Sequence, residues 1–216
     1  MSGMKDGGYQ GVMTTNCAEY DGVEKAECTA VDRALAAAAG LGDRVADRRL
    51  IKRVLPRVRK TVHFLAQDRT DADDFAQQAL LEILRSAVTF RGECGLDYWA
   101  DRVTVQTLAK QFERRKRRRG IRDRFWMAPK DTMAVDEQVA LTEARERLRV
   151  HFGELPERLR MPVVLHYVHG YDVSEIAEIV EAKVNTVRGR LRDGLRRLRK
   201  KVRNDPTLRE WMAWER

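Results

Sequence analysis

The sequence has few cysteines and lacks a long apolar run, and each scarcity excludes a class of protein. Its three cysteines, Cys17, Cys28 and Cys94, are too widely spaced for a disulfide framework or a zinc site. The apolar stretch ALAAAAGLG near the N-terminus has nine residues, whereas a membrane-spanning helix needs about 20. The residues before this stretch include acids and do not form a basic leader, so it is not expected to be a secretory signal. We expect a soluble, cytoplasmic protein without membrane insertion.

Catalytic and metal-binding patterns are also scarce. The sequence has no phosphate-cradling glycine loop and no nucleophile motif. His166 and His169 in HYVHG have no third ligand at a recognisable spacing, so no metal is expected there. The acids Asp71, Asp73 and Asp74 leave a metal-dependent nuclease as an alternative, but they fit the first turn of a capped helix. We therefore expect no enzyme, no metal and no cofactor.

Positive charge is abundant and unevenly placed. The chain of 216 residues has a net charge of +9 and a pI near 9.7. Residues 1–44 carry a net charge of −3, so residues 45–216 carry +12. A basic body favours an acidic partner, with nucleic acid first and an anionic membrane second.

The apolar pattern predicts an all-α fold whose first domain spans residues 45–119. Sustained alternation of apolar and polar residues is absent, so strands have little support. Residues 75–88 repeat an apolar pair every four positions, and residues 50–65 have compatible spacing, so the two helices should pack together. A loop is predicted in RGECGLDYW. A third helix then leads into six consecutive basic residues, 114–119.

A second helical domain is predicted at residues 151–203, after a linker at 120–150 that leads into a helix. Its first helix either starts close to Pro162 or bends there, and Gly170 ends it. A short helix follows with Asp172 as N-cap and Glu175 three residues later. The last helix is apolar on one side and arginine-rich elsewhere, which is the helix-turn-helix pattern. Residues 1–44 form an acidic N-terminal extension, and residues 204–216 form a C-terminal tail. We expect both ends to be disordered or packed on themselves.

Two groups of side chains suit nucleic acid. At the start of the last helix, arginine can hold guanine and asparagine adenine, while arginines further along suit phosphates. A solvated arginine-rich helix is the alternative, but only Asp193 offsets nine basic residues there. In the first domain, aromatic and basic residues from Phe90 to Phe112 suit a single strand, because bases stack on rings and cations follow phosphates. The alternative for Trp99 and Phe112 is an ordinary place in the core.

The order of these features resembles a known family. Region two of the extracytoplasmic-function sigma factors of bacterial RNA polymerase is similar to DADDFAQQALLEILRSAVTFRGECGLDYWADRVTVQTLAKQFERRKRRR. Region four is similar to LPERLRMPVVLHYVHGYDVSEIAEIVEAKVNTVRGRLRDGLRRLRKK. The two matches stand in the family's order and cover residues from about 45 to 203. The joint match is far more specific than a lone helix-turn-helix.

The resemblance implies a promoter-specificity subunit that binds core RNA polymerase, recognises promoter DNA and promotes its melting. DDFAQQ corresponds to the segment that binds the clamp helices of the largest polymerase subunit, which assigns Asp73, Asp74, Gln77 and Gln78 to that contact. An anti-sigma factor could dock on the extension or the tail. The runner-up is a stand-alone helix-turn-helix regulator that binds duplex operator DNA.

The resemblance also assigns the promoter contacts. FRGECGLD and YWADRVTVQ correspond to the loop that captures a flipped minus-ten base and to the helix that lines the melted strand. The expected minus-ten residues are Phe90, Arg91, Glu93, Cys94, Asp97, Trp99, Arg102 and Gln106. The minus-thirty-five element is assigned to Lys183, Asn185, Thr186, Arg188, Arg190 and Arg192. Phosphates are assigned to Arg114, Arg115, Lys116, Arg117, Arg118, Arg119 and Arg196.

Four residues depart from the family pattern. Gln106 stands where asparagine is common, and Lys110 stands where aspartate is common. Glu181 replaces the usual turn glycine, and Lys183 replaces the usual serine cap of the recognition helix. In the minus-ten loop, Cys94 adds a redox hypothesis.

Overall fold

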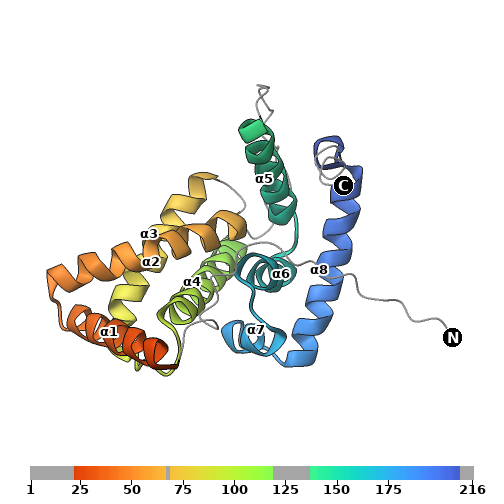
Figure 1. The fold of residues 1–216 in the computed structure, drawn as a ribbon. Helices are drawn as coiled ribbons and strands as arrows, with labels where there is room; N and C mark the ends of the chain where they lie inside the picture. Colours follow the sequence, from red (N-terminus) through yellow and green to blue (C-terminus); the bar gives the residue numbers. More distant parts are fainter. Residues whose placement is uncertain (1–21, 67–68, 119–136, 210–216) are drawn as a thin grey trace.

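The computed structural model describes residues 22–66, 69–118 and 137–209, and the regular elements in these ranges are all helical. The all-α prediction is confirmed. No helix in the described ranges is both long and apolar enough to cross a membrane. In chain order the elements are α1 (Gly22–Gly40), α2 (Arg44–Leu65), α3 (Arg69–Ser86), the 3-10 helix η1 (Ala87–Thr89), α4 (Leu96–Arg118), α5 (Glu137–Gly153), α6 (Glu157–His169), α7 (Val173–Ile179) and α8 (Val184–Asn204) (Figure 1).

Helices α1 to α4 form an N-terminal unit in which α2 packs against the other three. The predicted packing of α2 on α3 is confirmed. Asp43 caps α2, because its side chain accepts hydrogen bonds from two backbone N–H groups at 2.8 and 3.3 Å. The loop after Phe90 is shorter than predicted. Helix α4 begins at Leu96, and the carbonyl of Gly95 already accepts a hydrogen bond from the N–H of Trp99 at 3.1 Å.

Helix α1 lies in the acidic extension, where the sequence pattern predicts no helix. Ala36 and Ala39 are buried in the common core, and α1 packs on α2 and η1. The approach to η1 is close, because a Cβ atom on Gly40 would lie 2.8 Å from the backbone nitrogen of Val88. The small apolar side chains of α1 give a weak helical periodicity, which is why the pattern missed it. Residues 1–21 lie outside the described ranges.

Helices α5 to α8 form a C-terminal unit. Helix α5 begins inside the predicted linker, and residues 119–136 lie outside the described ranges. Helix α6 begins at Glu157, so Pro162 lies inside the helix and not at its start. Gly170 ends α6 with φ of +80°, as predicted. The predicted capping box of Asp172 and Glu175 is confirmed, with both reciprocal hydrogen bonds present at the start of α7.

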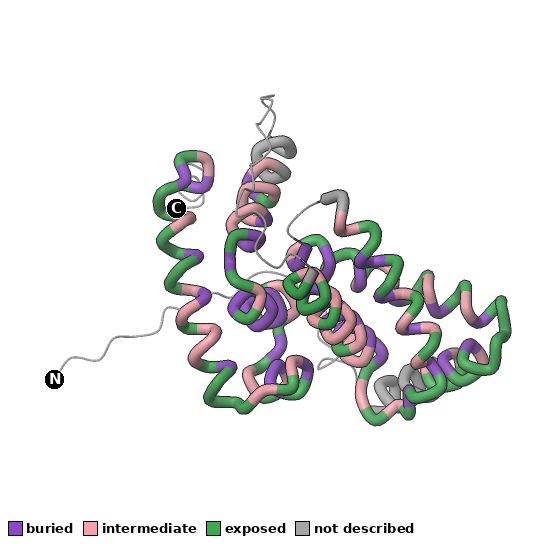
Figure 2. Tube along the Cα trace, turned by 180° about the vertical axis from the view of Figure 1, so that it is seen from behind, coloured by how far each residue is buried: buried purple, intermediate pink, exposed green. Residues whose placement is uncertain are grey.

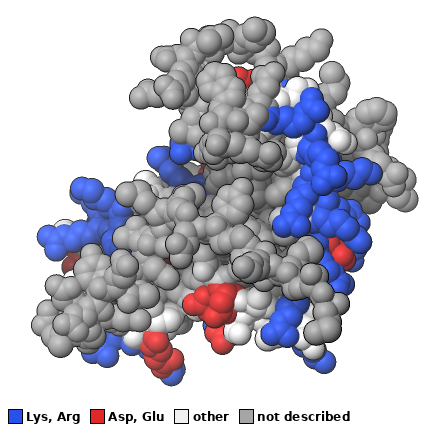
Figure 3. Space-filling view, turned by 45° about the vertical axis from the view of Figure 1, so that its right-hand side comes forward, with Lys and Arg blue, Asp and Glu red and all other residues white. Residues whose placement is uncertain are grey.

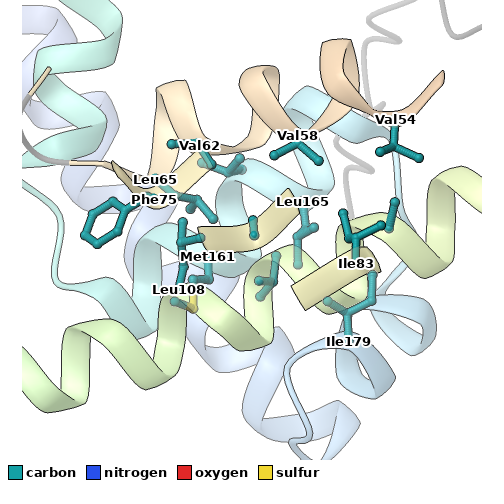
Figure 4. Packing of buried hydrophobic residues seen from close by; sticks show 14 of the residues in the cluster. Val54, Val58, Val62, Leu65, Phe75, Ile83, Leu108, Met161, Leu165 and Ile179 are labelled. Atoms are coloured by element: carbon teal, nitrogen blue, oxygen red, sulfur yellow. The ribbon is translucent and has the colours of Figure 1, made fainter. Parts of the chain in front are cut away.

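One apolar core runs through both units. Buried side chains from α2, α3 and α4 belong to the same cluster as those from α6 and α7, as the close view in Figure 4 shows. Figure 2 shows buried positions on the sides of the helices that face their neighbours. The units also meet directly, through α2 with α5 and α6 and through α4 with α7. The two predicted helical domains are therefore packed against each other.

Replacing Gly194 by alanine is expected to lower the free energy of unfolding by about 1–2 kcal/mol, because it overpacks the contact between α6 and α8. A Cβ atom at Gly194 would lie 2.6 Å from Cγ2 of the fully buried Val163. Gly189→Ala is the matched control on the same helix, since its added methyl meets nothing within 4 Å. The control should stabilise by up to about 1 kcal/mol through helix propensity. Urea unfolding compares the two, and equal effects would contradict the predicted clash.

Candidate nucleic-acid interface

Helix α8 presents a basic face to solvent. Its inner side carries the buried residues Val187, Gly194 and Leu198, and the helix packs against α5, α6 and α7. Figure 3 shows lysine and arginine side chains gathered in a column over this helix. Asp193 is the only acid in α8, and it lies 3.3 Å from Arg196 and 4.0 Å from Arg192. The residues predicted for the minus-thirty-five element are brought together here, all exposed except the partly exposed Arg190: Lys183, Asn185, Thr186, Arg188, Arg190 and Arg192.

Two of the departures from the family pattern, Glu181 and Lys183, lie in the turn before α8. Glu181 has φ of +51°, which is the left-handed conformation that glycine adopts most easily. Lys183 is the N-cap residue, and its side chain makes no capping hydrogen bond. The first N–H groups of α8 therefore lack the side-chain acceptor that a serine would supply.

A hollow of about 670 Å³ opens between η1, the following loop and α4. The rings of Phe90 and Trp99 stand at its wall, with centroids 5.3 Å apart and planes inclined at 49°. Seven of the eight predicted minus-ten residues line it: Phe90, Arg91, Glu93, Cys94, Trp99, Arg102 and Gln106. The eighth, Asp97, does not line it and accepts a hydrogen bond from Arg53 at 3.1 Å. The wall also includes Lys110, one of the departures from the family pattern. The remaining wall residues were not singled out from the sequence for this site: Glu82, Ser86, Val88, Thr89, Val103 and Thr107.

The wall of this hollow combines rings, cations and hydrogen-bonding groups. Phe90 is buried, whereas Trp99 is half-buried and offers part of its ring to a ligand. Arg91, Arg102 and Lys110 are exposed. An aromatic surface beside cations is suited to a stacked base with its phosphates, as the sequence predicts. The hollow thus combines the kinds of group that bind an unpaired nucleotide.

Cys94 gains no support as a redox sensor. Burial raises the pKa of its thiol, and this outweighs the opposing effect of Arg102. Reactive cysteines have a lowered pKa, because the thiolate is the nucleophile. Cys94 is therefore a wall residue of the hollow in its thiol form.

The predicted polymerase-binding residues share an exposed surface on α3. Asp73, Asp74, Gln77 and Gln78 are all exposed. Gln78 accepts a hydrogen bond from Gln111 of α4, which anchors one edge of the surface. Leu81 is 48% exposed and continues the same face one turn later. Nothing in the local sequence marks it as exposed. The surface is open for a protein partner.

The basic run at the end of α4 divides into two kinds of residue. Arg114, Lys116 and Arg117 are exposed, as phosphate contacts require. Arg115 instead turns inward, pairing with Asp71 and lying 4.4 Å above the ring centroid of Phe75. Its guanidinium joins α4 to α3, in contrast to the predicted role on DNA. Arg118 belongs to α4 without a described side chain, and Arg119 lies outside the described ranges.

The acids weighed for a nuclease do not gather around a common point. Asp71 is committed to Arg115, with its Oδ1 accepting a hydrogen bond from Nη2 at 2.9 Å. Among the described residues, no group of three or more histidine, cysteine or acidic side chains could hold a metal ion.

Comparisons with known proteins identify the family of the chain. The family model for sigma-70 region 2 matches residues 50–118, and that for sigma-70 region 4 matches residues 145–198. The chain is 27% identical over 160 residues to the ECF RNA polymerase sigma factor SigM of Mycobacterium tuberculosis, covering 74% of this chain and 78% of that protein. It is 28% identical over 172 residues to the ECF RNA polymerase sigma-E factor of Haemophilus influenzae, covering 74% and 89%.

A solved structure shares the fold. The sigma factor RpoE in complex with the anti-sigma factor NepR from Bartonella quintana matches with a TM-score of 0.56 at 18% identity, covering 73% of this chain and 97% of that one. The two family models fall on the two helical units in the order that the sequence predicts. The chain therefore belongs to the sigma-70 family, in its extracytoplasmic-function group.

Proposed function

We propose that this sigma factor directs core RNA polymerase to promoters by reading the minus-thirty-five element with α8 and capturing a minus-ten base in the hollow beside α4. One observation carries the proposal. A single chain presents both a basic recognition helix and a ring-lined hollow, on two units that match different sigma-70 regions. A stand-alone operator-binding protein would need only the first of these.

The exposed face of α3 supplies the contact with polymerase in this proposal. Asp73, Asp74, Gln77 and Gln78 would bind the clamp helices of the largest subunit, which places the protein in the cytoplasm with its promoters. The matched RpoE structure contains an anti-sigma factor, so we include such a protein among the expected partners. The exposed cations Arg114, Lys116 and Arg117 would follow the phosphates next to the melted strand.

Run-off transcription with bacterial core RNA polymerase tests the function. A pool of promoter fragments from the source genome is transcribed with and without the protein. Transcripts that start at defined sites only in its presence support the proposal and give the promoter sequence. A palindromic duplex site bound without polymerase, with no redirected initiation, would favour the operator-binding regulator.

Arg188→Ala and Arg196→Ala should separate base reading from phosphate contact on α8. Loss of a bidentate contact to a base costs about 1–3 kcal/mol of discrimination, so Arg188→Ala should relax the preference at one base pair. Arg196→Ala should weaken all duplexes equally and lower the slope of log K against log salt by about 0.9. Titration of duplexes with single base-pair changes measures both effects. If both variants lose affinity uniformly, the assignment of Arg188 to a base is wrong.

A further inference from the structure

Arg115 differs from the other cations at the end of α4 in what its guanidinium contacts. Nη2 donates a hydrogen bond to Oδ1 of Asp71 in α3 at 2.9 Å, and Nη1 donates a second one to Oδ2. Two parallel bonds from one guanidinium to one carboxylate fix both the distance and the orientation of the two groups. The pair is partly enclosed, since the side chain of Arg115 is 33% exposed and that of Asp71 is 27% exposed. We call this pair the Asp71–Arg115 link between α3 and α4.

An aromatic ring also holds the Arg115 guanidinium in place. Its central carbon lies 4.4 Å from the ring centroid of Phe75, which is one helical turn after Asp71. Phe75 meets Phe112 of α4 edge to face, with centroids 5.4 Å apart and planes inclined at 86°, and both residues are buried. A planar guanidinium can stack on a ring and bind a carboxylate through two bonds at once, whereas the ammonium group of lysine cannot. The geometry of the link therefore depends on arginine.

The Asp71–Arg115 link lies at the start of α3, beside the surface that is proposed to bind polymerase. Asp71 is in the first turn of α3, and Asp73 and Asp74 follow two and three residues later. A second contact joins the same two helices, because Gln111 of α4 donates a hydrogen bond to Gln78. The two attachment points on α3 are about 10 Å apart along the helix, at a rise of about 1.5 Å per residue. Together they set how α3 is rotated on α4, and so where its exposed side chains point.

The Asp71–Arg115 link is the stronger of these two attachments. It joins two charged groups that are partly enclosed, whereas the bond between Gln111 and Gln78 joins neutral amides in an exposed position. Charge-assisted hydrogen bonds are roughly twice as strong as neutral ones. Helix ends are also the parts of a helix that open most easily. Without the link, the first turn of α3 would have to be ordered again whenever polymerase binds, which lowers affinity.

The same geometry argues against a contact between Arg115 and DNA. Its guanidinium is directed to Asp71, while its neighbours Arg114, Lys116 and Arg117 are exposed. To reach a phosphate, Arg115 would have to leave the Asp71 carboxylate unpaired near the bound strand, where like charges repel. The phosphate contacts of the basic run are therefore better assigned to its exposed members.

We propose that Arg115 is a positioning residue for polymerase binding, which holds the start of α3 through Asp71 so that Asp73 and Asp74 face the clamp helices. This role rests on the proposed function and deepens it, because the exposed face of α3 is the polymerase contact there. Arg115 itself contacts neither polymerase nor DNA in this arrangement. Its loss should weaken assembly with core polymerase and leave the phosphate contacts unchanged.

Titration with labelled core RNA polymerase compares Arg115→Ala with Arg85→Ala in the full chain. Arg85 is the matched control, because it also pairs with a carboxylate, but with Glu82 of its own helix at 3.8 Å and with a side chain that is 74% exposed. Arg115→Ala should bind core polymerase about tenfold more weakly, within the range of couplings between contacting residues. Arg115→Lys keeps the charge without the two parallel bonds, so its affinity should lie between those of Arg115→Ala and wild type. Arg85→Ala should bind as wild type does.

The outcomes of this titration separate the positioning role from the proposed function. If wild type binds core polymerase and Arg115→Ala binds it equally well, the positioning role is wrong and the proposed function stands. If wild type itself does not bind core polymerase, the proposed function is rejected. An equal loss in Arg85→Ala would also count against positioning, because that substitution leaves the link intact.

A salt titration separates positioning from phosphate contact. Binding of the free chain to duplex DNA is measured at several salt concentrations. Arg114→Ala should lower the slope of log K against log salt by about 0.9 for one lost duplex-phosphate contact. Arg115→Ala should keep the wild-type slope. A decrease in Arg115→Ala as large as that in Arg114→Ala would assign Arg115 to DNA and overturn the proposal.

A double-mutant cycle shows whether Arg115 acts through Asp71. Asp71→Ala should weaken binding to core polymerase about as much as Arg115→Ala does, and the double variant should bind no more weakly than either. Additive losses would contradict an action through the link. Circular dichroism checks that each variant is folded. If an alanine variant does not fold, Arg115→Lys and Asp71→Asn replace it in the cycle, with smaller losses that should again not add.

Discussion

Replacing Asp101 by alanine is expected to lower the free energy of unfolding by about 3–5 kcal/mol, as removal of one partner of a buried ion pair does. The substitution leaves Arg57, Thr61 and Tyr171 without the carboxylate that now accepts their hydrogen bonds. Arg57 would then remain as a partly buried cation against the ring of Tyr171, 5.6 Å from its centroid. Urea unfolding followed by circular dichroism measures the loss.

Asp97→Ala is the matched control for this experiment. Asp97 lies one turn earlier on α4 and also pairs with an arginine of α2, Arg53, but both side chains are at least 40% exposed. An exposed pair contributes at most about 1 kcal/mol. Of these two carboxylates only Asp101 bonds to the C-terminal unit, through the Tyr171 hydroxyl, so Asp101→Ala should also increase the radius measured by X-ray scattering. Equal destabilisation by the two substitutions would show that the buried hydrogen bonds of Asp101 add no more to the free energy of unfolding than an exposed ion pair does.

The helices were predictable where their apolar residues are large. Helices α2, α3 and α8 follow from the spacing of leucine, isoleucine and valine, and the capping box of α7 follows from Asp172 and Glu175. Helix α1 was not predictable, because the residues it buries are alanines such as Ala36. The family resemblance predicted seven wall residues of the hollow. It also assigned Asp97 to the minus-ten site, whereas the Asp97 side chain accepts a hydrogen bond from Arg53 and does not line the hollow.

Contacts between distant segments explain what the sequence could not show. Arg57 and Tyr171 are 114 positions apart, and no pattern within one helix relates them. Arg115 is different, because it stands three residues after the buried Phe112 and shares its helix face. That spacing indicates an inward side chain, although a run of six basic residues suggests six equivalent cations. Helical phase, read together with charge, would have distinguished Arg115 from its neighbours.

Acidification from pH 6.5 to pH 4.5 is expected to cost the fold about 2 kcal/mol through His169 alone. An exposed imidazole has a pKa near 6.5, whereas burial first, and then Arg57 and Lys60, lower the pKa of His169 to about 3. Between these values the unfolded chain binds a proton that the folded chain does not. The free energy of unfolding therefore falls as pH falls below about 6.5, by up to about 1.4 kcal/mol per unit.

The neighbours of His169 decide how this effect is isolated. Burial raises the pKa of Asp101 despite its hydrogen bonds from Arg57, Tyr171 and Thr61, so its contribution above about pH 4 has the opposite sign. The difference between wild type and His169→Gln removes that contribution, because Asp101 is present in both. His169→Gln should flatten the fall in stability. Urea titrations across this pH range measure the difference. If His169→Gln keeps the wild-type slope of unfolding free energy against pH, another group is responsible for the titration. The neutral imidazole of His169 would then not explain why the two units stay together at pH 7.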